Sequence, residues 1–333
     1  MPDIGVRYRT QRKFLGLRLR VGIPMFLPMN SESALSRPHQ NHRESSIRSV
    51  EGVYRGDPLH WVGNGFHVST YFPTRQIDPE RVSPFVLMDY GEPKDFGPLA
   101  KGKRGVGWHP HRGFETVTLA WEGGVAHRDN AGNHGLIGPG DAQWMTAGAG
   151  IFHEEYHAEP FTRMGGRMHM MQLWVNLPKR NKFAAPAYQA IAAAQVPTVQ
   201  LEGGQVRVLA GEFEGAAGPA RTFTPITMLD ARLNAGGRLS VPLPAGYNAL
   251  AVVAKGRIRV GDTSAGRGDL VLYRNDGTRL ECSVDEDCHL VVLAGEPLGE
   301  PVVQYGPFVM NTREEIEQAI VDVELGRFGR VPD

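Results

Sequence analysis

The clearest indication of the fold and of a candidate metal site is the stretch GWHPHRGFETV at residues 107–117. Two histidines in this stretch, His109 and His111, are separated by a single residue. Side chains two apart on an extended strand leave the same face, so both imidazoles would point in one direction. A chain with 12 histidines can contain such a pair by chance, so the pair alone is weak evidence for a metal site.

A second stretch, TAGAGIFHEEYH at residues 146–157, repeats the same spacing with His153 and Glu155. The glycines at 148 and 150 leave room for close backbone approach just before that pair. Two strands that each offer such a pair can close four nitrogen and oxygen donors around one ion inside a β-barrel. The predicted ligands are His109, His111, His153 and Glu155.

Around these stretches the pattern is that of short strands separated by Gly and Pro, which is typical of a barrel or sandwich. A series in the first half and another in the second predict an all-β architecture of two barrels in tandem. Lys255-Gly256 fits a hairpin turn in the second series. The predicted strands are 66–72, 114–122, 142–146, 227–233, 248–254, 257–260, 269–274 and 289–294.

The last predicted element is a helix that begins after Thr312. Glu315, three residues on, would complete a capping box, and Gly326 would end the helix. One apolar face would pack on the barrels, because its residues recur at helical spacing. That face consists of Ile316, Ala319, Ile320 and Val323.

Composition narrows the class of protein. The 333 residues favour two domains. Lys+Arg and Asp+Glu are equal at 36 each, so no basic excess suggests nucleic-acid binding. Two cysteines, Cys282 and Cys288, are too few for a disulfide framework or a Cys-based zinc site, and we expect thiols in a reducing, cytoplasmic setting.

Residues 1–48 differ in composition from the rest of the chain. We predict a disordered basic leader there, which ends in a linker rich in Ser, His and Arg. Pro24 and Pro28 interrupt its one apolar run, which argues against a cleaved signal peptide. The sequence contains no apolar run long enough for a membrane helix.

Four segments resemble the cupin superfamily and, more narrowly, the pirin family. In cupins a Glu follows the His-x-His pair, and here Glu115 stands at that place. The pirin pattern instead moves the carboxylate to a Glu two residues after the second-motif His, which maps to Glu155 and leaves Glu115 a role next to the site or on the surface. The segments are HPHRGFETVT at 109–118, PGDAQWMTAGAGI at 139–151, QLWVNLP at 172–178 and AGEPLGEPVVQYGPFVMNTREEI at 294–316.

The resemblance implies two double-stranded β-helix, jelly-roll-like cupin barrels. It also implies a mononuclear iron, as Fe²⁺, in the first barrel, although the ligand types suit Mn, Ni, Cu or Zn as well. The second barrel would be metal-free: it has Val241-Pro242-Leu243 where ligands belong, and His289 stands alone. The expected division is 49–183 for the first barrel, 184–310 for the second, and 311–333 for a helix and tail packed on the barrels.

Relatives of this type are often assigned quercetin 2,3-dioxygenase activity, which opens a flavonol with O₂ and releases CO. The expected substrate is therefore a small aromatic or enolic compound, with Glu155 as general base. The alternative is a non-enzymatic iron redox sensor that binds a protein partner in transcription or metabolism. A third possibility, a storage or structural bicupin, does not need four convergent polar donors.

For other residues near the site, both a structural and a functional role are possible interpretations of the sequence. The remaining nearby histidines are expected to be structural or exposed; they are His127, His134, His157 and His169. Several large apolar residues could line a substrate cavity, but most are expected in the core of the barrel. They are Trp108, Phe114, Trp144, Met145 and Met168 to Met171.

Overall fold

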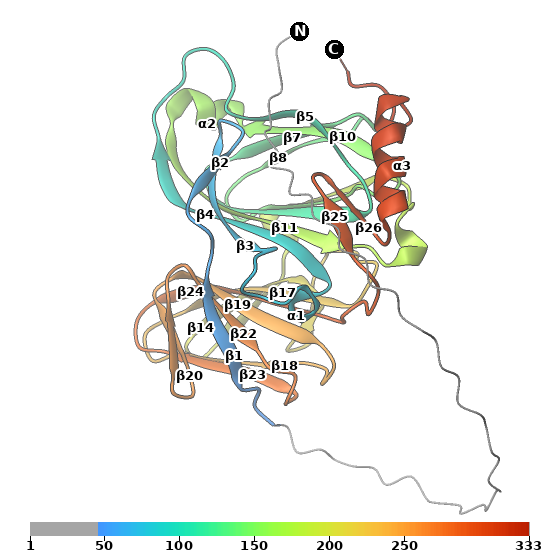
Figure 1. The fold of residues 1–333 in the computed structure, drawn as a ribbon. Helices are drawn as coiled ribbons and strands as arrows, with labels where there is room; N and C mark the ends of the chain where they lie inside the picture. Colours follow the sequence, from blue (N-terminus) through green and yellow to red (C-terminus); the bar gives the residue numbers. More distant parts are fainter. Residues whose placement is uncertain (1–45, 333) are drawn as a thin grey trace, which may run out of the picture. The chain divides into compact units, whose positions relative to one another are not determined.

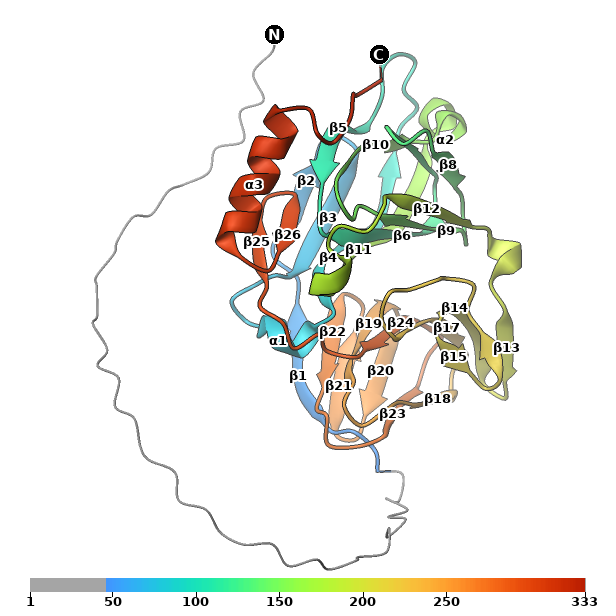
Figure 2. The ribbon, with the colours of Figure 1, turned by 90° about the vertical axis from the view of Figure 1, so that its right-hand side faces the viewer.

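The computed structural model describes residues 46–332. They form two β-barrels, each made from one seven-stranded and one four-stranded sheet, followed by a C-terminal helix (Figure 1, Figure 2). Neighbouring strands within these sheets are antiparallel. The predicted all-β tandem architecture is confirmed. Of the leader predicted for residues 1–48, residues 1–45 lie outside the described residues.

The first barrel has strand orders β12-β9-β6-β11-β4-β3-β2 and β5-β10-β7-β8. Its large sheet consists of β12 (Ala187–Ile191), β9 (Ala142–Thr146), β6 (Phe114–Glu122), β11 (Gly166–Asn176), β4 (Phe85–Phe96), β3 (Phe66–Phe72) and β2 (His60–Val62). Its small sheet consists of β5 (Gly105–His111), β10 (Ile151–His157), β7 (Val125–Asp129) and β8 (His134–Ile137).

The second barrel repeats this plan with orders β1-β22-β19-β24-β17-β14-β13 and β18-β23-β20-β21. Its large sheet consists of β1 (Val50–Arg55), β22 (Asp269–Tyr273), β19 (Asn248–Lys255), β24 (Cys288–Gly295), β17 (Ile226–Leu233), β14 (Gly204–Ala210) and β13 (Thr198–Leu201). Its small sheet consists of β18 (Arg238–Pro242), β23 (Arg279–Val284), β20 (Arg257–Val260) and β21 (Thr263–Gly266).

Short elements connect and extend the barrels. The strands are β15 (Glu212–Phe213), β16 (Ala216–Ala217), β25 (Val303–Tyr305) and β26 (Phe308–Met310). The helices are α1 (Pro79–Val82), α2 (Glu159–Met164), α3 (Arg313–Glu324) and the 3-10 turns Lys179–Asn181 and Ala193–Gln195. No helix among the described residues is long and apolar enough to cross a membrane.

Side-chain alternation divides each large sheet between two cores. On β6, Val117, Leu119 and Trp121 belong to a core that also includes Leu250 and Val252 of β19, so the outer faces of the two large sheets share apolar burial. The second barrel also has a separate apolar interior of its own. The residues of β6 on the other face, such as Thr118, therefore point into the first barrel.

Two strand exchanges cross the predicted domain limits. β1 falls in the range predicted for the first barrel, yet it pairs with β22 of the second. β12 falls in the range predicted for the second barrel, yet it pairs with β9 of the first. Arg48, at the end of the predicted leader, is buried and donates to the carbonyls of Tyr247 and Pro244. The structure therefore differs from the sequence-based division at residues 46–55 and 187–191.

The helix α3 begins and ends as predicted. The Thr312 side chain accepts from the backbone N–H of Glu315, and the Glu315 carboxylate accepts from the backbone of Thr312. Ile316 and Ala319 are buried against the hairpin β25–β26. The predicted hairpin at Lys255-Gly256 is wrong, because β19 and β20 belong to different sheets and the chain crosses between them at this turn.

Candidate metal centre

Strands β5 and β10 are neighbours, and their register brings three histidines together. His153 lies opposite His109, and Ile151 lies opposite His111. The ring centres of His153 are 4.2 Å from His109 and 4.8 Å from His111, and His109 and His111 are also 4.8 Å apart. One nitrogen of each ring lies within 4.8 Å of the others, so the three imidazoles converge as donors to one ion.

The hydrogen bonds of these rings leave one nitrogen of each free. His109 Nδ1–H donates to the carbonyl of Gly107 at 2.8 Å, and His111 Nδ1–H lies 3.3 Å from the carbonyl of Pro307. Such contacts fix the tautomer in which Nε2 carries the lone pair. His153 Nε2 is buried and has no hydrogen-bond partner. A buried acceptor of this kind is costly unless something binds it, and a metal ion at this point would do so.

Burial keeps these imidazoles neutral. It is the main cause that lowers the pKa of His109, and it lowers the pKa of His111 and His153 well below the ordinary value. The neighbouring rings add to this effect for His111 and His153. Neutral imidazole is the form that binds metal, so the site is prepared to bind a cation near neutral pH without first losing protons.

Glu155 lies close to His153, in a group of donor atoms that also includes His127. A bulge interrupts the pairing of β5 and β10 between His153 and Glu155, so that Glu155 lies opposite Val106. Its carboxylate accepts from Gln143 at 2.5 Å and from Gln172 at 2.8 Å. Thr118 is a third, longer donor at 3.4 Å. Three neutral donors hold the carboxylate in place near the imidazoles.

Among the described residues, donor atoms gather in two overlapping groups. One is His109, His111 and His153; the other is His127, His153 and Glu155. His153 belongs to both, so the four predicted ligands lie in one region. Whether all four bind one ion stays a prediction.

Glu115 takes no part in either group, for a reason that strand alternation supplies. It lies on the same face of β6 as Val117 and Leu119, which pack in the core shared by the two barrels. It is therefore buried away from the histidines, and neither of the two roles expected for it fits. Burial raises its pKa to about 7, against a hydrogen bond from Thr146 at 2.8 Å.

The other nearby histidines divide as follows. His134 is exposed, while His157 is buried and contacts the carbonyl of Gly65 at 2.8 Å. His169 is buried beside Tyr90 at 2.9 Å. The sequence predicts a structural or exposed His127, yet this residue lies in the site, with its ring centre 5.4 Å from that of His153. Its signal in the sequence was the spacing His127-x-Asp129, a third pair two residues apart.

The C-terminal segment also contacts the strand that carries His111. Arg112 donates to Asp322 of α3 at 2.8 Å and to the carbonyl of Ala149 at 2.7 Å. Phe328 lies 4.4 Å below the Arg112 guanidinium, and a side chain at Gly150 would collide with its ring. The close approach expected at this glycine is therefore present, and both α3 and the segment after it pack against this wall of the site.

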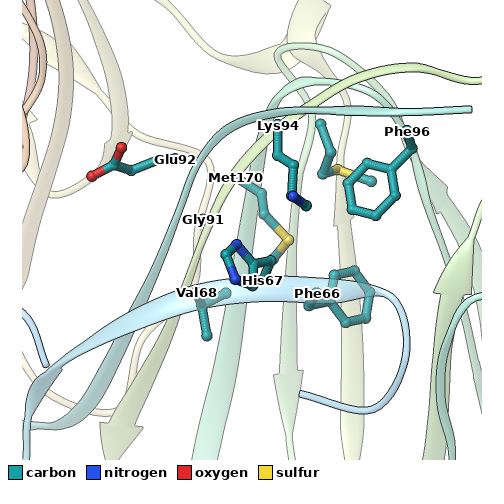
Figure 3. Close-up of a pocket in the computed structure, with 9 residues that line it drawn as sticks. Phe66, His67, Val68, Gly91, Glu92, Lys94, Phe96 and Met170 are labelled. Carbon is teal, nitrogen blue, oxygen red and sulfur yellow. The ribbon is translucent and has the colours of Figure 1, made fainter. Parts of the chain in front are cut away.

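Most of the large apolar residues near the site belong to the core, as expected. Trp144 and Met171 are in the shared core, and Met145 packs with Ile151. Phe114 is an exception, because it stacks on Trp174 beside His111. Met168 and Met170 line a cavity of about 10 Å³ with Phe66 and Phe96 (Figure 3), room for about one water and no substrate.

Two barrels in tandem, with convergent imidazoles inside the first, define a bicupin with a candidate metal centre. Comparison with known families agrees. A model described as Pirin matches residues 65–175, and one described as Pirin C-terminal cupin domain matches residues 228–329. The chain belongs to the pirin family.

Individual relatives support this assignment. A Pseudomonas aeruginosa protein named "Putative quercetin 2,3-dioxygenase" is 48% identical over 286 residues, which cover 85% of this chain and 99% of the relative. Human pirin is 40% identical over 260 residues, 75% of this chain and 84% of that protein. A crystal structure of quercetin 2,3-dioxygenase from Acinetobacter baumannii matches with a TM-score of 0.82 and 42% identity, covering 86% of this chain and 100% of the other.

Proposed function

We propose that this protein is an iron-dependent dioxygenase that opens quercetin-like flavonols with O₂ and releases CO. The observation that carries the proposal is the convergence of His109, His111 and His153, with His153 Nε2 buried and unpartnered. The names of the similar proteins from Pseudomonas aeruginosa and Acinetobacter baumannii support the reaction class. Divalent iron held there would supply a Lewis acid for a substrate oxygen and the redox chemistry that O₂ requires.

The residues of the chain would supply the remaining functions. Glu155 would complete the ligand set and accept the hydroxyl proton of the flavonol, because one of its carboxylate oxygens lies within 4.8 Å of a ring nitrogen of His153. Gln143 and Gln172 hold that carboxylate from two sides and would keep it oriented as it takes up the proton. Trp174, which stacks on Phe114 at 4.2 Å beside His111, offers an aromatic wall for a flat substrate.

The test measures bound metal, O₂ uptake and flavonol absorbance on the same samples. We expect wild-type protein loaded with Fe²⁺ to consume O₂ and flavonol together and to release CO. His109→Ala should lose both metal and turnover, whereas His134→Ala, which removes an exposed histidine of the same sheet, should keep both. Glu155→Gln should lower turnover by about 10²- to 10⁴-fold if Glu155 is the base.

Bound iron without turnover across a panel of flavonols would overturn the dioxygenase. The redox-sensing alternative would then be favoured, and a partner complex that depends on the oxidation state of the iron would support it. The cytoplasmic location stays a prediction; the two cysteines are unpaired and buried in the second barrel.

A further inference from the structure

A chain of hydrogen-bonding groups runs from the surface turn after β7 to His153. Asp129 Oδ2 lies 3.3 Å from His127 Nε2, and His127 Nδ1 lies 3.5 Å from His153 Nδ1. The register of β7 and β10 explains the arrangement, since His153 lies opposite Asp129 and Glu155 lies opposite His127. All three side chains are buried.

Proton positions along this chain follow from its two ends. Asp129 is a carboxylate and can only accept, so His127 Nε2 carries the hydrogen. A neutral His127 then has its lone pair on Nδ1, which accepts from His153 Nδ1–H. His153 is left with its lone pair on Nε2, the atom that is buried without a partner. The chain therefore selects the tautomer of His153 that can bind an ion beside His109 and His111.

The outer end of the chain is itself held firmly. Asp129 accepts from the backbone N–H of Ala131 at 3.0 Å and of Asn133 at 2.9 Å. The Asn133 side chain also donates to Asp129, at 2.9 Å. Burial alone would raise the pKa of Asp129, but the hydrogen bonds from His127 and Asn133 outweigh it and lower that pKa. An ionised, fixed acceptor is therefore available to His127.

The His127 ring is also fixed in orientation. Tyr188 of β12 stacks on it with ring centres 4.8 Å apart and planes 16° apart. Tyr188 in turn donates to Gln143 Oε1 at 3.3 Å, and a Cβ at Gly135 would lie 2.0 Å from its hydroxyl oxygen. The exchanged strand β12 thus contributes a side chain that locks the imidazole behind His153.

We propose that His127 and Asp129 are positioning residues of the metal centre, which set the tautomer and direction of His153 and strengthen it as a donor. The proposal rests on the metal site of the proposed function but not on dioxygenase activity. Partners that donate or accept behind a ligand histidine typically contribute about 10- to 100-fold in metal affinity.

The experiment measures the affinity for Co²⁺ by chelator competition and the visible absorption spectrum of the Co²⁺ protein. His127→Phe keeps a ring to stack on Tyr188 but removes the acceptor, and we expect about 10- to 100-fold weaker binding with an altered spectrum. His127→Gln restores an acceptor and should recover part of the loss. Asp129→Asn removes the charge behind His127 and should weaken binding less than His127→Phe.

His169→Phe is the matched control, because it removes a buried histidine of the first barrel that lies outside the metal centre. His169 contacts Tyr90, which belongs to the core shared by the two barrels. It should leave Co²⁺ affinity and spectrum unchanged, and circular dichroism would check that each variant is folded. A folded His127→Phe that binds Co²⁺ as wild type does would overturn the proposal.

Two further results separate this proposal from others. Wild-type protein that binds neither Co²⁺ nor Fe²⁺ would overturn the metal centre itself. If His109→Ala binds Co²⁺ normally while His127→Phe does not bind it at all, His127 is a ligand and the positioning role is overturned. Weaker Co²⁺ binding by His127→Phe, in a protein without flavonol turnover, would support the positioning role and count against the dioxygenase alone.

Discussion

The two barrels share one strand order and have opposite interiors. The small sheet of the first, β5-β10-β7-β8, corresponds strand by strand to β18-β23-β20-β21 of the second. In the first, imidazoles and carboxylates occupy several inward positions beside apolar residues such as Val125 and Ile151; in the second, the inward positions carry buried aliphatic side chains and one thiol. The same backbone plan therefore serves as a donor site in one case and as a packed core in the other.

Register makes the comparison residue by residue. His153 pairs with His109 on β5, as Cys282 pairs with Leu239 on β18. Glu155 pairs with His127 on β7, as Val284 pairs with Ile258 on β20. In this alignment the first barrel has polar residues at six positions, His109, His111, His127, Asp129, His153 and Glu155. The second has Leu239, Val241, Ile258, Val260, Cys282 and Val284 at the same six.

This difference supports the proposal that His127 and Asp129 serve the metal centre. If they served only the packing of the barrel, aliphatic side chains would do, as Ile258 and Val260 do in the second barrel. Buried polar groups cost stability unless they are satisfied. Their presence behind His153 is therefore best explained by the donor that they orient.

The largest expected effect comes from making the first barrel resemble the second. His153→Leu should weaken metal binding by at least about a hundredfold, because one of few ligands is lost. Its counterpart Cys282→Val should leave metal content unchanged and alter the free energy of unfolding by less than about 1.5 kcal/mol. Elemental analysis and urea unfolding check both. Metal retained by His153→Leu, or lost from Cys282→Val, would contradict the comparison.

Much of this contrast could be predicted from the sequence, because strand alternation is a local signal. The strands 66–72, 114–122 and 142–146 have the predicted limits, and so does the capping box at Thr312. The three histidines converge as their spacing indicates. Local patterns also showed that the second barrel has apolar residues at Val241 and Leu243, both of which are buried.

Pairings between distant segments could not be predicted in this way. Nothing local to β1 or β12 specifies that each joins the sheet of the other barrel. The turn at Gly256 has the composition and, with φ of +76°, the backbone conformation of a hairpin turn, but the strands that it joins belong to different sheets. His127 was missed because its role depends on a strand that lies beside β10 only in three dimensions.

The next largest effect concerns the outer faces of the large sheets. β6 and β19 occupy the same place in the strand orders of the two large sheets. Glu115 and Asn248 correspond on these strands, because each lies two residues before a residue of the shared core, Val117 or Leu250. Asn248 donates to the carbonyls of Glu80 and Ser83 and accepts from Arg81. Glu115 has one carboxyl oxygen buried without a partner. The first barrel therefore contains an acid in a place where the second has a satisfied amide.

Glu115→Gln should remove a pH dependence of stability. The folded pKa is about 7 and the ordinary value is 4.5, so between these values the folded state holds a proton that the unfolded state has lost. Wild-type stability should fall as pH rises through that window, by about 3 kcal/mol in all. The variant should match wild type below the window and exceed it above. Urea unfolding at several pH values measures this.

The control is Glu122→Gln, which changes an exposed glutamate at the end of the same strand. It should shift the free energy of unfolding by less than about 0.5 kcal/mol at every pH. If the stability of the Glu115→Gln protein depends on pH as that of wild type does, Glu115 is not buried as a neutral carboxylic acid. The contrast between Glu115 of the first barrel and Asn248 of the second would then be wrong.

The smallest expected effect tests to which barrel the C-terminal helix belongs. α3 follows the second barrel in sequence, but Asp322 pairs with Arg112, the residue after His111. The Arg112 hydrogen bond is the main cause that lowers the pKa of Asp322 to about 2. This contribution is therefore present above the ordinary pKa of 3.8 and is lost as pH falls toward 2.

Asp322→Asn keeps the shape and removes the charge, and we expect a loss of about 2 kcal/mol in the free energy of unfolding near neutral pH. Glu317→Gln on the same helix is the control, because its pair with Arg313 is exposed and should contribute less than about 0.5 kcal/mol. Arg112 is the residue after His111, and the Pro307 carbonyl that faces His111 lies just before β26. Loss of the Asp322 pair should therefore loosen His111, and we expect Asp322→Asn to weaken Co²⁺ binding several-fold. A variant that loses stability but binds Co²⁺ as wild type does would show that α3 supports the wall of the first barrel without influencing its histidines.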